Sequence, residues 1–161
     1  MAEDFDNGPS GIVAKPDWRY IAPIPQGTFL RLSFQFNALW ENMIWICNAN
    51  THEKLADRGN YSRSRDQFVT DENTQFSPNF AIGLVAYHKL VSPDVGAGYP
   101  WRQSPMAILQ DDGKTTVIGF NDEGGPGFNQ AICAITRVGG VTPPPGPFGT
   151  APFGPITAGK Y

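Results

Sequence analysis

The chain has 161 residues, of which 40% are hydrophobic and only 17% are charged, and its net charge is −3 at pH 7. The 18 glycines and 15 prolines leave few stretches of ten residues that could form a helix, so an all-β protein is expected. The slight negative charge, and the acids that interrupt the basic cluster of Arg58, Arg63 and Arg65, argue against nucleic acid as a partner.

Residues 1–17 are polar and acidic and lack the apolar core of a secretory signal peptide. No run of the sequence approaches the roughly 18 apolar residues that a membrane span needs. We therefore expect no membrane span, and either a cytoplasmic location or export to the cell surface by a route without such a signal. The prolines and glycines of residues 1–17 predict an extended N-terminal arm, with at most a short strand at residues 12–14.

Residues 18–24 are typical of an edge strand, because Pro23 and Pro25 would end its pairing. Residues 25–36, PQGTFLRLSFQF, contain a turn and then strict alternation, which predicts a strand with one buried and one exposed face. After a loop, the apolar residues 43–47 predict another strand. Residues 48–79 are hydrophilic and are expected to form a long loop, either functional or partly structured.

The continuous apolar run of residues 80–90 predicts a central strand. Residues 105–110 and 114–120 flank a Gln-Asp-Asp-Gly turn and predict a hairpin, and residues 131–138 predict one more strand. About eight strands separated by turns indicate an antiparallel β-sandwich over residues 18–140. Cys47 and Cys133 lie in apolar surroundings and are interpreted as buried free thiols, although pairing is open.

The C-terminal residues 141–161 are rich in proline and glycine and contain a near-repeat, PFGTA followed by PFGPI. Such a segment cannot build a core of its own and should be extended. Its apolar side chains, unlike those of a purely solvated linker, could anchor it on a neighbour: Phe148, Phe153, Ile156 and Tyr161. The two terminal arms therefore suggest a homo-oligomer with arm-mediated subunit contacts.

A turn-rich loop, residues 121–130, lies between the last two predicted strands and is dense in oxygen donors. Calcium takes six to eight such oxygens, in part from backbone carbonyls that glycine can turn inward. The sequence therefore indicates a possible calcium site, against the simpler interpretation of a hairpin loop whose side chains cap their own backbone. The donors are Asn121, Asp122, Glu123, Asn129 and Gln130.

Three segments make residues 25–138 resemble the small calcium-dependent, galactose-specific bacterial lectins, which are jelly-roll β-sandwiches. PQGTFLRLSFQF resembles the early strand of that family, and AIGLVAYHKL resembles its central strand. Phe120-Asn121-Asp122, followed by Asn129-Gln130, resembles the aromatic-Asn-Asp and paired asparagines that bind calcium there, at the same spacing from the acid to the first amide.

The resemblance implies specific roles. Asp122 and Asn129 would bind both calcium and the sugar hydroxyls, Gln130 would stand for the second asparagine, and Pro126 would offer its carbonyl. Trp40 would match a tyrosine that gives calcium a backbone carbonyl, and it could also contact the sugar. His52 lies in the region of a sugar-contacting histidine. Trp40 or Trp45 could stack on the sugar, although a tryptophan in an apolar run is usually part of the core.

Two functions fit these observations. The first is a calcium-dependent, lectin-like protein that binds a galactose-type carbohydrate. The second is a self-assembling structural subunit of a filament, coat or appendage. No enzymatic activity is expected, because His52, His88 and both cysteines lack a recognisable catalytic setting and neither GxSxG nor HExxH occurs.

Overall fold

The computed structural model describes residues 4–9, 11–12, 19–23, 28–61, 68–69, 81–90, 99–123 and 126–139. These ranges contain ten strands and no helix long and apolar enough to cross a membrane. The strands are β1 (Tyr20–Pro23), β2 (Thr28–Phe36), β3 (Glu41–Asn48), β4 (Lys54–Gly59), β5 (Phe68–Val69), β6 (Ala81–Lys89), β7 (Arg102–Gln103), β8 (Met106–Asp111), β9 (Thr115–Phe120) and β10 (Ala131–Gly139).

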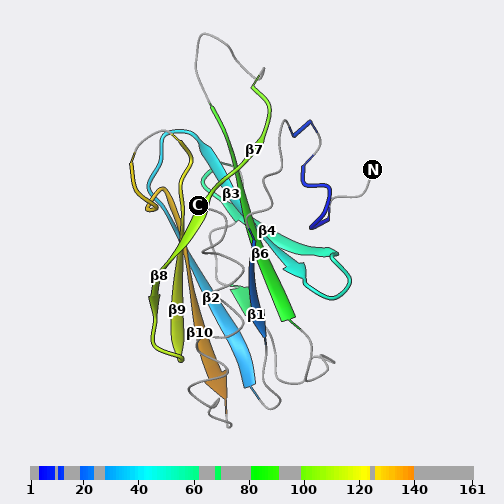
Figure 1. Ribbon diagram of the computed structural model, residues 1–161, viewed down its shortest axis with the longest axis vertical. Coiled ribbons are helices and arrows are strands. Elements are labelled where there is room, and N and C mark those ends of the chain that lie inside the picture. Colours follow the sequence, from blue (N-terminus) through cyan, green and yellow to red (C-terminus); the bar gives the residue numbers. More distant parts are fainter. Residues whose placement is uncertain are drawn as a thin grey trace.

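The strands form two sheets that pack face to face (Figure 1). One sheet has the order β1-β6-β3-β4, with β7 also paired to β6, and the other has the order β5-β2-β10-β9-β8. Every pairing is antiparallel. The predicted antiparallel β-sandwich is therefore confirmed.

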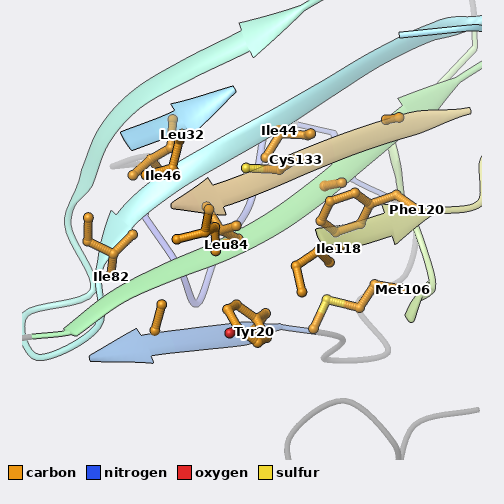
Figure 2. Close-up of a cluster of buried hydrophobic side chains, with 14 of the residues drawn as sticks. Tyr20, Leu32, Ile44, Ile46, Ile82, Leu84, Met106, Ile118, Phe120 and Cys133 are labelled. Atoms are coloured by element: carbon orange, nitrogen blue, oxygen red, sulfur yellow. The ribbon is translucent and has the colours of Figure 1, made fainter. Parts of the chain in front are cut away.

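The space between the sheets holds the main core, which both sheets supply (Figure 2). On β2, Leu30 and Leu32 are buried while Arg31 is exposed, so the alternation in the sequence is realised as one core face and one solvent face. On β6, Ile82 and Leu84 point into the same core. Full burial of each large aliphatic side chain contributes roughly 1.5–3 kcal/mol.

The hydrophilic residues 48–79 are not one loop, because β4 and β5 lie within them. β4, KLADRG, pairs with β3 at the edge of its sheet, where half-exposed positions tolerate polar side chains. A β-bulge at Ile46 and Cys47 shifts the register of this pair. The expectation that this segment would be partly structured holds for these two strands.

The predicted hairpin after residue 105 is confirmed as β8 and β9. Asp112 closes its turn, because the carboxylate Oδ1 accepts the backbone N–H groups of Lys114 (3.0 Å) and Thr115 (2.7 Å). These hydrogen bonds lower the pKa of Asp112. Gly113 follows with a φ of 86°, a left-handed conformation that glycine adopts without strain.

A second apolar cluster covers the outer face of the β1-β6-β3-β4 sheet. β3 and β6 contribute Met43, Trp45, Cys47, Val85 and Tyr87, and the N-terminal segment contributes Phe5, which is 2% exposed. This N-terminal segment is held by a bridge between Asp4 and Glu53, and the N–H of Phe5 donates to the carbonyl of His52 (2.8 Å). Part of the predicted N-terminal arm therefore packs on the sheet of its own chain.

The two cysteines are free and buried, which confirms the sequence interpretation. Cys47 belongs to the outer cluster and Cys133 to the core between the sheets. Burial raises the pKa of Cys47 to about 12 and also raises that of Cys133, so neither thiol forms a thiolate readily.

The remaining predictions about the two terminal arms concern residues that the structure describes only in small part or not at all. The short strand predicted at residues 12–14 lies largely outside the described residues, as does the whole C-terminal tail, 141–161. Subunit contacts through the arms stay a prediction.

The Phe5 ring occupies space that Gly83 leaves open, since a Cβ at Gly83 would lie 2.4 Å from Phe5 Cζ. Phe5→Ala should lower the free energy of unfolding by about 3 kcal/mol, measured by urea denaturation. Gly83→Ala should cost about 1–3 kcal/mol in the parent chain but under about 0.5 kcal/mol in the Phe5→Ala background. Additive costs would show that the ring does not sit on Gly83.

Candidate functional site

Two loops meet at one end of the sandwich because their strands are neighbours. β10 lies between β2 and β9, so the loop after β2 (residues 37–40) adjoins the loop between β9 and β10 (residues 121–130). The N–H of Asn37 donates to the carbonyl of Gln130 (2.9 Å) and fixes this contact. The loop that was predicted to bind a ligand therefore has a second loop beside it.

Asp122 is the buried carboxylate of this region, with 2% of its surface exposed. The Nδ2 group of Asn42 donates to Asp122 Oδ2 (3.0 Å) and to the carbonyl oxygen of Trp40 (3.1 Å). The backbone N–H of Asn42 in turn donates to Oδ1 of Asn60 (2.8 Å). Asn42, on β3 of the opposite sheet, thus holds Asp122 and Trp40 in a fixed relation.

Asp122, Trp40 and Gln130 line one cavity of about 220 Å³, together with Asn37, Ala38 and Leu39. Three of the residues predicted for the site are therefore brought together. The lining includes a carboxylate, two amides and a tryptophan. It can therefore exchange hydrogen bonds with hydroxyl groups and cover an apolar surface.

The other predicted residues of the loop hydrogen-bond to one another. The side-chain amide of Gln130 lies within hydrogen-bonding distance of Oδ1 of Asn129 (3.0 Å) and of the carbonyl of Pro126 (3.3 Å). Asn121 donates from Nδ2 to the carbonyl of Gly127 and accepts the N–H of Glu123 at Oδ1 (2.6 Å). Asn129 and Pro126 are thus linked to the cavity through Gln130, which lines it.

His52 lies at the opposite end of β3 from Trp40. That strand has eight residues, so the two positions are separated by roughly 26 Å. His52 Nδ1 is 2.6 Å from Asp6 Oδ2, and its ring meets the Phe5 ring edge to face with centroids 5.9 Å apart. The structure therefore places His52 against the N-terminal segment and not among the residues that line the cavity.

Trp45 lies in the outer cluster, fully buried and 4.9 Å from the ring of Tyr87. This agrees with the interpretation of Trp45 as a core residue. Trp40, which is half-buried, is the tryptophan that faces the cavity.

His88 is a residue of the region that the sequence did not assign to the site, and it pairs with Glu123, one of the predicted oxygen donors. His88 on β6 is 2% exposed and stacks on Trp40, with ring centroids 6.5 Å apart and planes 19° apart. Its Nε2 is 3.0 Å from Glu123 Oε2, and its Nδ1 is 2.8 Å from Ser104 Oγ. Burial lowers the pKa of His88, although Glu123 and Asp122 act in the opposite direction.

These contacts assign the tautomer of His88. A carboxylate only accepts hydrogen bonds, so Nε2 carries the proton and donates to Glu123, while Nδ1 accepts from the Ser104 hydroxyl. A neutral imidazole is fixed on both sides and supports one face of Trp40. The only sequence signal for this role was a histidine at the polar end of an apolar run.

The oxygen donors at the cavity fit a hard cation by their chemistry. Asp122 supplies a carboxylate, and Oδ1 of the neighbouring Asn42 is buried with no hydrogen-bond donor among the described residues. In the same ranges no three His, Cys, Asp or Glu residues gather to hold a metal. The number of carboxylates tunes calcium affinity, so this donor set would favour a weakly held ion.

Comparison with known proteins finds no family model and no curated protein that matches the sequence. Among solved structures, a Ralstonia solanacearum high-affinity mannose-binding lectin is 15% identical with a TM-score of 0.49, over 75% of this chain and 96% of that one. The C-terminal domain of a Burkholderia cenocepacia lectin is 14% identical with a TM-score of 0.47, over 76% and 97%. A Chromobacterium violaceum lectin in complex with α-methyl-fucoside is 14% identical with a TM-score of 0.49, over 75% and 96%.

Asn42 is expected to be the residue that holds the site together. Asn42→Ala removes a donor that serves both Asp122 and the Trp40 carbonyl, and should lower the free energy of unfolding by about 2–3 kcal/mol in urea denaturation. Asn48→Ala, at the other end of β3, is the matched control, because the Asn48 side chain only caps an exposed turn. The control should cost about 1 kcal/mol or less. An equal cost for both would contradict the role of Asn42.

Proposed function

We propose that the chain is a carbohydrate-binding protein and that its ligand is a galactose-type sugar, held in the cavity of Asp122, Trp40 and Gln130 with the help of calcium. The observation that carries the proposal is the fixed pairing of a buried carboxylate with an aromatic wall across one small cavity. A sugar needs both partners, because it presents hydroxyl groups on its rim and C–H groups on a ring face.

Asp122 suits the hydroxyl groups. A carboxylate only accepts hydrogen bonds, and bonds to a charged acceptor are about twice as strong as neutral ones. Because Asn42 fixes Oδ2 of this carboxylate, little side-chain entropy remains to be lost when a sugar binds. Gln130 and Asn37 add amides that can both donate and accept.

Trp40 suits the apolar face of the ring. In a galactoside the axial 4-hydroxyl leaves the opposite face with a continuous set of C–H groups, which can lie on an indole ring. The stacked His88 keeps that indole in place. This geometry favours a galactoside over its 4-epimer, a glucoside, whose equatorial 4-hydroxyl changes both the apolar face and the direction in which the hydroxyl donates.

Calcium enters the proposal through the oxygen donors and the resemblance to calcium-dependent lectins. The residues that would hold it are Asp122, the amides of Asn129 and Gln130, and the carbonyls of Pro126 and Trp40. When bound, the ion would supply positive charge that attracts hydroxyl oxygens. With one buried carboxylate, an affinity near 10⁻⁴–10⁻³ M, on the order of that of weak extracellular calcium modules, is expected.

The test is calorimetric titration with methyl α-galactoside and methyl α-glucoside, in 5 mM calcium (about 5 to 50 times the expected calcium Kd) and then in EDTA. We expect galactoside binding in calcium, at least about tenfold weaker glucoside binding, and loss of both in EDTA. Asp122→Asn should weaken galactoside binding by about 10- to 100-fold, through loss of charge-assisted hydrogen bonds.

Asp112→Asn is the matched control, because Asp112 precedes β9 whereas Asp122 follows it, so the same substitution is made at opposite ends of one strand. It should leave sugar binding unchanged. Equal binding in calcium and EDTA would remove calcium from the proposal, and the absence of sugar binding in both would contradict the function itself.

A further inference from the structure

A second cavity of about 270 Å³ shares Trp40 with the first. Trp40 belongs to the lining of both cavities, and the consecutive residues Asp122 and Glu123 face one cavity each. The two cavities are therefore neighbours that adjoin at Trp40. This cavity is not used by the function proposed above for a single sugar.

We propose that the two cavities form one continuous site for a neutral oligosaccharide, with a second sugar residue seated against Arg102, Glu123 and Tyr99. The inference rests on the proposed function and specifies its ligand as a chain of at least two sugars. Each cavity alone is smaller than the roughly 300 Å³ at which sites for larger ligands begin, whereas the two together lie within that range.

The polar groups of the second cavity match a neutral sugar. Arg102 is exposed, and none of the described residues pairs with its guanidinium, so five N–H donors face the cavity region. Glu123 accepts a hydrogen bond from His88 Nε2 at Oε2 while its side chain stays 56% exposed, which leaves acceptor capacity toward solvent. A hydroxyl group both donates and accepts, and this cavity offers a partner for each.

Charge decides between neutral and acidic sugars. The charges of Arg102 and Glu123 cancel, and the buried carboxylate of Asp122 is next to Glu123 in the chain, so the region carries no excess positive charge for a uronic or sialic acid. Tyr99 supplies a ring surface for a C–H face of the second sugar. The cavity therefore favours a second neutral residue over an anionic one.

The test compares methyl α-galactoside with galactobioses linked α-1,3, α-1,4, α-1,6 and β-1,4, by calorimetry on the full chain in calcium. At least one galactobiose should bind about tenfold more tightly than the monosaccharide. Arg102→Gln should reduce that advantage to less than about threefold, while the affinity for methyl α-galactoside stays within about twofold. Arg31→Gln, an exposed arginine on the other sheet, should change neither value.

The outcomes separate the two proposals. If the monosaccharide binds and no galactobiose binds better, the extended site is overturned while the proposed function stands. If Arg102→Gln weakens both ligands equally, the second cavity is not a separate subsite and the inference is likewise overturned. If neither sugar binds, both proposals fail.

Discussion

The position of β10 between β2 and β9 is the constraint on which the candidate site depends. In an antiparallel pair the end of one strand lies beside the start of its partner, and Phe36 at the end of β2 pairs with Ala131 at the start of β10, so the loop after β2 and the loop before β10 must meet. The opposite sheet then adds Asn42, whose amide reaches both Asp122 and the Trp40 carbonyl. The site is thus assembled across the sandwich from residues of both sheets.

The outer face of the β1-β6-β3-β4 sheet is covered by the N-terminal segment and is not part of the candidate site. The outer surface of β3 and β6 is as apolar as the inner one and is covered by Phe5 from the N-terminal segment. Arg19 supports this cover, because its guanidinium lies 4.1 Å from the centre of the Phe5 ring and donates to the Phe5 carbonyl (3.0 Å). His52 takes part in this packing, which gives it a structural role far from the cavity.

The sequence predicted those parts of the fold that depend on local pattern. The alternation in β2 and the apolar run of β6 identify strands, because the apolar positions of each sequence follow directly from which faces of the strand are buried. β4 was not predicted, because this edge strand is defined by its backbone pairing with β3 and not by a hydrophobic pattern. Asp122 could be predicted from its loop, whereas Asn42 and His88 could not, since their roles arise from the register that places them opposite each other.

Binding of a sugar beside Asn42 and Trp40 can be followed in side-chain ¹⁵N–¹H NMR spectra recorded with methyl α-galactoside and calcium. We expect shifts of the Asn42 amide and of the Trp40 indole N–H, with the Asn48 amide and the Trp45 indole unchanged, because these two lie at the far end of β3 and in the outer cluster. Shifts confined to the region of His52 and Phe5, or none at saturating sugar, would contradict it.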